Sequence, residues 1–132
     1  MEINLQPGLV GEKQELVTED NTAIKYGSGD VAVFATPALV GLMEGASINA
    51  VDRLLPAGFC TVGISISTTH SAATPIGMTV TARAKLLEVH GRRLVFKVEG
   101  FDDKEPVGAG THERYIVQMD KFMQKNQSKQ QG

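Results

Sequence analysis

Tryptophan is absent from this chain of 132 residues, aromatic residues make up only 5% of it, and cysteine occurs once, as Cys60. A lone cysteine excludes an internal disulfide and any metal site built from several cysteines. At this length a single domain can bury roughly two-thirds of the surface of its unfolded chain. We therefore expect one domain that folds around an apolar core without disulfides or a structural metal.

Excess positive charge is lacking as well. The chain has 13 basic and 15 acidic residues, a formal net charge of −2, and no basic stripe. Binding to nucleic acid depends on a concentration of Lys and Arg, so a nucleic-acid partner is not expected. The first residues show neither the basic segment nor the apolar run of a secretory signal. These observations predict a cytoplasmic protein.

Charge is nearly absent from the stretch between Val31 and Val51, where Glu44 is the only charged residue. An ionised carboxylate in apolar surroundings costs several kcal/mol unless it is paired. Because Pro37, Gly41 and Gly45 interrupt the stretch and Glu44 lies near its centre, we expect no membrane span here. The pattern instead predicts a buried helix in which Glu44 has partners and a function.

The start and the end of this helix are signalled clearly. Thr36 is a suitable N-cap residue and Pro37 suits the first helical position. Apolar residues then recur at helical spacing as far as Leu54, and Pro56 and Gly58 follow. Gly41 and Gly45 are expected to allow close packing of the helix on a sheet.

Beyond the helix, apolar and polar residues alternate with a period of two. This predicts four long antiparallel strands in a meander: Val62–His70, Met78–Leu86, Leu94–Val98 and Val107–Met119. Two shorter strands, Glu12–Thr18 and Val31–Phe34, precede the helix, and the polar tail from Asp120 is expected to fray. The order of elements predicts an α+β fold, a curved antiparallel sheet wrapped around one long central helix. Open sheet edges in such a fold suit a homodimer.

Four blocks of sequence carry a resemblance to a known family. Together they resemble the hotdog thioesterases related to fluoroacetyl-CoA thioesterase. The similarity extends from about residue 8 to Phe122, so we expect a hotdog domain over residues 1–122 and a polar tail over 123–132. In chain order the blocks are Thr18-Glu19-Asp20-Asn21-Thr22-Ala23, Phe34-Ala35-Thr36-Pro37-Ala38-Leu39-Val40-Gly41-Leu42-Met43-Glu44, His70-Ser71-Ala72-Ala73-Thr74-Pro75-Ile76-Gly77 and Gly110-Thr111-His112-Glu113-Arg114.

The resemblance implies a dimeric enzyme that hydrolyses acyl-CoA thioesters without a metal. No cofactor is implied other than the coenzyme A of the substrate itself. The catalytic residues of the family fall on Thr36, Glu44 and His70 of this sequence. A glycine and an arginine of the family site fall on Gly63 and Arg114, which are therefore expected to contact the substrate. A glycine within a strand either lets a ligand approach the backbone closely or marks a bulge.

Each candidate also has a purely structural interpretation. Glu44 is either a carboxylate paired with an arginine such as Arg114, or a group that attacks the thioester or takes a proton from water. The Thr36 hydroxyl can cap the helix and still donate outward. His70 is either a buried histidine bonded to backbone or a group that orients Thr36 or Glu44 and passes protons.

The other two histidines are weaker candidates. His90 lies in a turn and is expected to be solvated, whereas His112 shares a strand face with Arg114 and forms either the rim of the site or a surface pair. The three histidines lack the ligand spacing of a zinc site. Arg92, Arg93 and Lys85 are either solvated or meet coenzyme A phosphates.

Spacing along the helix limits how the site can be built. Glu44 follows Thr36 by eight positions, a rise of about 12 Å, so we expect substrate or water between them and His70 reaching that gap from the sheet, from the same or another protomer. Free N–H groups at the helix start suit the oxyanion of a tetrahedral intermediate. The N–H of Ala38 or Leu39 is the predicted donor.

Departures from the family pattern bear on the substrate. Members specific for fluoroacetyl-CoA have an aromatic residue shortly before the Phe34-Ala35-Thr36 block and another just after the glutamate, where this chain has Gly29-Asp30-Val31 and Gly45. This predicts a roomier pocket and a short- to medium-chain or aryl acyl group. Two alternatives remain: a hotdog dehydratase or hydratase, for which an Asp–His pair in the helix-entry block is missing, and a non-catalytic acyl-CoA or small-ligand binder.

Overall fold

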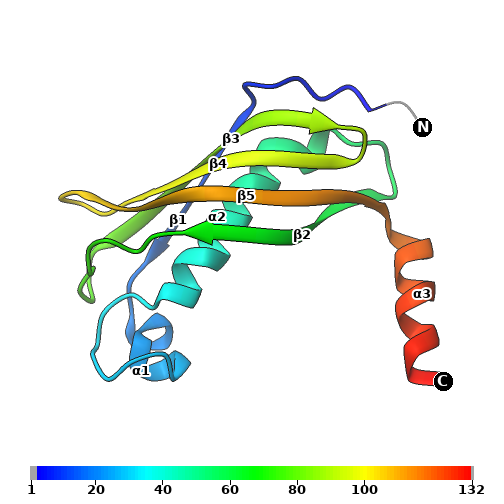
Figure 1. Ribbon diagram of the computed structural model, residues 1–132. Coiled ribbons are helices and arrows are strands. Elements are labelled where there is room, and N and C mark those ends of the chain that lie inside the picture. Colours follow the sequence, from blue (N-terminus) through cyan, green and yellow to red (C-terminus); the bar gives the residue numbers. More distant parts are fainter. Residues whose placement is uncertain (1–2, 132) are drawn as a thin grey trace.

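The computed structural model describes residues 3–131. It contains a five-stranded antiparallel sheet that curls around one long helix, α2 (Thr36–Val51) (Figure 1). This arrangement confirms the predicted α+β fold. The strands are β1 (Val10–Leu16), β2 (Phe59–Thr68), β3 (Thr79–His90), β4 (Arg93–Phe101) and β5 (Pro106–Gln118).

The strand order across the sheet is β1-β3-β4-β5-β2. β3, β4 and β5 form the predicted meander, but β2 pairs with β5 rather than with β3, so the meander of four strands was wrong. The segment between β2 and β3 is too long for a hairpin turn, and it instead carries the chain from one edge of the sheet to β3. β1 and β2 are therefore the two edge strands.

Two short helices stand where the sequence predicted no helix. These are η1 (Glu19–Asn21) and α1 (Ala23–Tyr26), and each begins at a threonine whose hydroxyl accepts a backbone N–H, Thr18 and Thr22 respectively. The strand predicted over Val31–Phe34 was wrong, since this segment forms only two isolated bridges, Thr22 to Phe34 and Val33 to Pro75. Even so, these bridges hold the segment beside the start of α1 and beside the loop that contains Pro75.

The helix α2 packs on the concave face of the sheet through Leu39, Met43 and Ala46, which are all fully buried. The opposite side of the helix is open: Pro37, Gly41 and Ile48 are exposed and Glu44 is half-buried. The close approach to the sheet is made at Gly11 of β1, where an added Cβ would collide with backbone atoms of α2. Gly41 instead faces open space, contrary to the packing role predicted for it.

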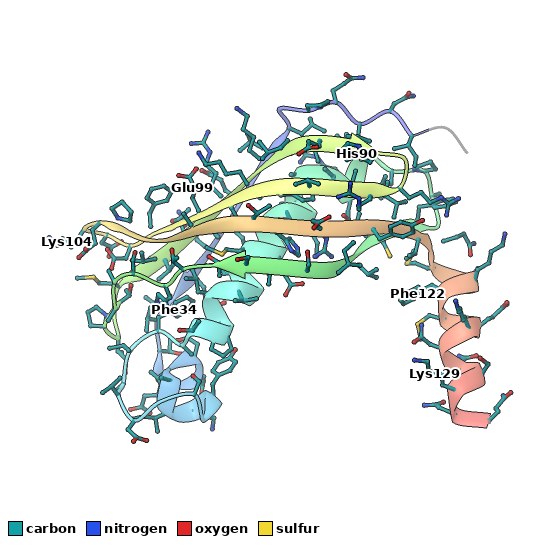
Figure 2. The ribbon with its side chains drawn as sticks, viewed as in Figure 1. Phe34, His90, Glu99, Lys104, Phe122 and Lys129 are labelled. Carbon is teal, nitrogen blue, oxygen red and sulfur yellow. The ribbon has the colours of Figure 1, made fainter. Side chains whose placement is uncertain are left out.

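The C-terminal segment forms a helix, α3 (Met119–Gln131), so the predicted fraying of this tail was wrong. Its lysines and glutamines are good helix formers, and no proline or glycine interrupts them. α3 extends away from the sheet at the end opposite Lys104, with Phe122 and Lys129 exposed along it (Figure 2). A short 3-10 helix, η2 (Asp52–Leu54), follows α2 directly. No helix within residues 3–131 is long and apolar enough to cross a membrane.

Candidate active site

The first part of the candidate site lies at the start of α2. The Thr36 hydroxyl oxygen is 2.7 Å from Nδ1 of His70 in the same chain. The N-cap of α2 is Ala35, without a side-chain hydrogen bond, so the capping role predicted for Thr36 was wrong. Because the helix begins one residue earlier than predicted, the hydroxyl is free of the helix end and bonds the histidine instead.

Backbone hydrogen bonds on either side of His70 hold it in place. The N–H of Thr69 donates to Ala109 and that of Ser71 donates to Val107, at 3.0 and 2.7 Å. His70 thus follows the end of β2, on a segment that still runs beside β5. Burial lowers the pKa of His70, which favours the neutral imidazole. Its Nε2 atom is buried and has no hydrogen-bond partner among the described residues.

A cavity of about 290 Å³ opens beside Thr36 and His70. Its walls come from the α1 region, the segment before α2 and the segment after His70, and small side chains make up much of them. The lining residues are Ala23, Ser28, Gly29, Val31, Val33, Phe34, Thr36, His70, Ser71, Ala72 and Ala73.

The amides at the start of α2 directly follow Thr36, which lines this cavity. The N–H of Leu39 already donates to the carbonyl of Ala35 at 3.0 Å, as the first bond of the helix. Because this N–H is already used in the helix, it is not available as the oxyanion donor that was predicted. The N–H of Ala38 precedes that first bond and has no partner in the helix ladder.

The second part of the site lies about two turns further along α2. Oε1 of Glu44 is 3.4 Å from Nη1 of Arg114, and the side chains of these residues are 39% and 4% exposed. The structural interpretation of Glu44 as the partner of Arg114 is thus met. Gly63 lies against the pair: a Cβ added there would be 2.6 Å from Oε1 of Glu44 and 3.4 Å from Nη1 of Arg114.

The structure therefore brings the predicted residues together as two groups. Thr36 and His70 form one group, and Glu44, Gly63 and Arg114 form the other. No hydrogen bond joins the two groups within the described part of the chain, in line with the rise between Thr36 and Glu44. Thr36 is exposed and Glu44 is half-buried, so each group has one α2 side chain that solvent can reach.

Three further residues lie behind the second group. Thr61 and Asp52 were not recognised from the sequence as site residues, and His112 was left ambiguous. Nε of Arg114 donates to the Thr61 hydroxyl at 2.8 Å, and its Nη1 is 3.1 Å from Nε2 of His112. The Thr61 hydroxyl in turn donates to Asp52 at 2.6 Å. Thr61 could have been found by its period-two spacing from Gly63, but the predicted strand began one residue later.

A bulge in β2 interrupts the period-two alternation that was predicted for this strand. The pairing with β5 slips between Gly63 and Ser65, so Thr61 and Gly63 point inward before the bulge and Ile66 after it. Strict alternation would put Ile64 on the same face as Ile66, but Ile64 is 52% exposed. A strict alternation cannot anticipate this extra residue.

Among the weaker candidates, His90 is exposed as predicted and lies 2.7 Å from Glu88, but it is the last residue of β3 rather than part of the turn. The space beside Gly45 is taken up by the stem of Lys13, whose Cδ would lie 2.6 Å from an added Cβ. Gly45 therefore does not enlarge a pocket. Within residues 3–131 no cluster of three or more His, Cys, Asp or Glu side chains could hold a metal ion.

Comparisons with known proteins agree with this arrangement. The family model described as fluoroacetyl-CoA-specific thioesterase matches residues 17–120. The fluoroacetyl-CoA thioesterase of Streptantibioticus cattleyicolor is 45% identical over 97 residues, 74% of this chain and 70% of the relative.

Solved structures show the same fold. That of the fluoroacetyl-CoA thioesterase FlK superposes with a TM-score of 0.89 at 36% identity, over 96% of this chain and 98% of that chain. A thioesterase superfamily member from Thermus thermophilus superposes with a TM-score of 0.88 at 23% identity, over 96% and 93% of the two chains. The chain therefore belongs to the fluoroacetyl-CoA-specific thioesterase family, a hotdog family of thioester hydrolases, as its motifs predict.

Proposed function

We propose that this chain hydrolyses a short- to medium-chain or aryl acyl-CoA thioester to the acid and free coenzyme A, using Thr36, His70 and Glu44 without a metal. The observation that carries the proposal is the 2.7 Å contact between the Thr36 hydroxyl and Nδ1 of His70 at the mouth of a cavity. A hydroxyl bonded to an imidazole at the start of a helix is an arrangement suited to acyl transfer.

The chemistry follows from the groups at the helix start. Burial lowers the pKa of His70 and so favours its neutral form, in which Nδ1 can accept a proton from Thr36 or from a water molecule beside it. The oxyanion that forms on the thioester carbonyl is stabilised by the free N–H of Ala38 and by the positive end of the helix dipole. The oxygen that loses this proton attacks the carbonyl, and when the tetrahedral intermediate collapses the C–S bond breaks and the proton on His70 passes to the leaving thiolate. If water is the attacking group, the acid is formed directly. If Thr36 is the attacking group, a water molecule deprotonated by His70 then hydrolyses the Thr36 ester and releases the acid.

Glu44 supplies the negative charge of the site. Its carboxylate is held by Arg114 and is still 39% exposed, so it can meet a substrate or a water molecule between the two groups. There it acts on water or on the acyl carbonyl, as base or as nucleophile. Gly63 and Arg114 border the same space and contact the substrate.

The acyl preference rests on the walls of the cavity. Ala23, Gly29, Ala72 and Ala73 are small, and no large aromatic side chain other than Phe34 lines the 290 Å³ space. Fluoroacetyl-CoA is the substrate in the name of the 45% identical relative, and a variant of FlK was solved in complex with acetyl-CoA. We assign acyl groups larger than acetyl and fluoroacetyl to this chain because small side chains line its cavity.

The functional form is proposed to be a homodimer. β2 is an edge strand with Ile64 52% exposed, and the open side of α2 carries Ile48 at 39% beside Glu44. A second copy on this side would close the site and cover the apolar surface.

Sedimentation should then give twice 14.1 kDa. An Ile64→Lys variant should become monomeric and lose activity, and a wild type that is fully active as a monomer would contradict the dimer.

Thiol release from a panel of acetyl-, fluoroacetyl-, butyryl-, hexanoyl- and benzoyl-CoA tests the function. Wild type should hydrolyse the larger acyl groups, while Thr36→Val, His70→Ala and Glu44→Gln should each lose at least about 100-fold in kcat/KM. Glu88→Gln, a change at an exposed carboxylate on β3, is the control. Turnover of fluoroacetyl-CoA alone would refute the acyl preference, and binding without thiol release would refute hydrolysis.

A further inference from the structure

We infer that Thr61, His112 and Asp52 are positioning residues that hold the Arg114 guanidinium in the one orientation in which it meets Glu44. The inference rests on the proposed function, because it assigns these residues a role in the reaction through Glu44. None of them is placed against the substrate. Their effect is transmitted through Arg114, which is 4% exposed and lies on the inner face of β5.

Arg114 is held at each of its three nitrogens. Nε donates to the Thr61 hydroxyl at 2.8 Å and Nη2 donates to the Thr61 carbonyl at 3.0 Å. Nη1 lies between Nε2 of His112 at 3.1 Å and Oε1 of Glu44 at 3.4 Å. A guanidinium is planar and its donors are fixed in a fork, so these contacts together define its orientation.

Asp52 sets the direction of the Thr61 hydroxyl. Asp52, at the end of α2, accepts the Thr61 hydroxyl at 2.6 Å with one oxygen and the Thr61 N–H at 3.0 Å with the other. A hydroxyl has one proton, and here that proton goes to Asp52. A lone pair of the hydroxyl oxygen is therefore left for Nε of Arg114.

His112 presents an acceptor to Arg114 because its other nitrogen is committed. Nδ1 lies 2.7 Å from the carbonyl of Ser65, which can only accept, so Nδ1 carries the proton. Nε2 of the neutral ring is then an acceptor facing Nη1 of Arg114. Burial lowers the pKa of His112, the Ser65 hydrogen bond opposes this shift, and the charge of Arg114 adds to the lowering.

The bulge in β2 places these groups. It leaves Gly63 paired with Arg114 and turns the carbonyl of Ser65 toward His112. A half-exposed carboxylate such as Glu44 has many rotamers open to it. Contact with the fixed guanidinium limits the Glu44 side chain to rotamers that place its carboxylate next to Gly63.

The test compares Thr61→Val with Thr61→Ser. Valine has nearly the same shape but removes the hydroxyl, whereas serine keeps it. For Thr61→Val we expect kcat to fall about 10- to 100-fold with little change in KM, as for a displaced catalytic group, and for Thr61→Ser we expect most of the activity to be recovered. Thr111→Val, on the exposed face of β5, is the control for the same change in composition.

A double-mutant comparison separates positioning from general stability. In a Glu44→Gln background, Thr61→Val should cause no further loss of kcat, because the group that it orients is already gone. A merely structural role would instead lower kcat by a similar factor in both backgrounds. Equal losses in both, or wild-type kcat in folded Thr61→Val, would overturn the inference.

A readout independent of activity follows the arginine directly. In ¹⁵N NMR spectra the Nε–H signal of Arg114 should shift in Thr61→Val and His112→Phe, and should stay close to its wild-type position in Thr61→Ser. An unmoved signal in Thr61→Val would overturn the inference. If wild type releases no thiol from any acyl-CoA, the proposed function fails, and this measurement still decides whether Thr61 and His112 hold Arg114.

Discussion

The chemical behaviour of individual site residues depends on the contacts of single atoms. His70 is the clearest case: one ring nitrogen lies 2.7 Å from Thr36 and the other is buried without a partner among the described residues. The ring is useful as a proton acceptor only when it is neutral. Its titration should therefore be visible in the rate.

Activity should persist into mildly acidic solution. Burial lowers the pKa of His70 from 6.5, so the neutral form that accepts a proton should survive below that pH. We expect the acid limb of the profile of kcat/KM against pH to have its midpoint below pH 6.5. Rates measured between pH 4.5 and 8.5 test this. A midpoint at or above 6.5 would contradict the lowered pKa of His70 or assign the limb to another group.

Gly63 should be intolerant of even one added carbon. A Cβ there would lie 2.6 Å from Oε1 of Glu44, so the carboxylate must move away from Arg114. For Gly63→Ala we expect kcat to fall about 10- to 100-fold, while the midpoint of thermal unfolding changes little because the displaced group is the end of a side chain. Ser67→Ala, at an exposed position of the same strand, is the control, and equal activities of the two variants would contradict the steric role.

At the scale of elements, the position of α2 is set by how closely it approaches β1. At Gly11 an added Cβ would collide with the backbone of Ala46 and Ala50, which cannot give way as a side chain can. Asn49 adds a hydrogen bond of 2.8 Å to the carbonyl of Glu12. The helix that carries Thr36 and Glu44 is thus held by its buried side.

Substitution of Gly11 should separate the helix from the strand. For Gly11→Ala we expect the free energy of unfolding to fall by about 1–3 kcal/mol, as for other overpacked positions. Urea unfolding followed by circular dichroism measures this. Gln14→Ala, an exposed change on the same strand, should change it by less than about 0.5 kcal/mol. An unchanged stability in Gly11→Ala would show that the two elements are not in close contact in solution.

For the whole molecule, acid should be destabilising as well as inhibitory. Burial lowers the pKa of both His70 and His112 from 6.5, so the unfolded chain binds more protons than the folded one as the pH falls. The stabilisation is fully present above pH 6.5 and is lost as the pH falls through the lower folded-state values. Thermal unfolding at pH 7.5 and 5.0 should show this loss, and His112→Gln should reduce it. A stability that rises on acidification would contradict the burial of both rings.

The far end of the molecule should be dispensable. No residue of α3 is buried, and the family match ends at residue 120. A chain that ends at Met123 should keep the unfolding midpoint and the kcat of the full chain. A chain that ends at Gln118 also loses the Met119 N–H bond to Gly58, 2.9 Å long, and should be measurably less stable. Loss of activity in the chain that ends at Met123 would assign the rest of α3 a role in the site.

Much of the fold could be predicted because it depends on local patterns. The start of α2 was placed within one residue by Thr36 and Pro37, and the meander from β3 to β5 by period-two alternation and turns. The partner of β2 could not be predicted, because strand order depends on which distant edge a segment reaches. A bulge was one of the two interpretations of Gly63 in a strand, and the structure has it directly after that glycine. Its effect on the strand face could not be predicted, because the extra residue is defined by a slip in pairing with β5.

By itself the sequence determined the kind of site: a lone carboxylate in an apolar helix, a threonine at the start of that helix, and a histidine after a strand, in motifs of a thioesterase family. Only the tertiary structure decided how these residues are grouped. Thr36 meets His70 because the segment after β2 passes beside the start of the helix, and Glu44 meets Arg114 because its side chain reaches from α2 to the inner face of β5. The physical reason is that hydrogen bonds reach about 3 Å, so residues far apart in the chain become partners only where packing brings their strands and helices together.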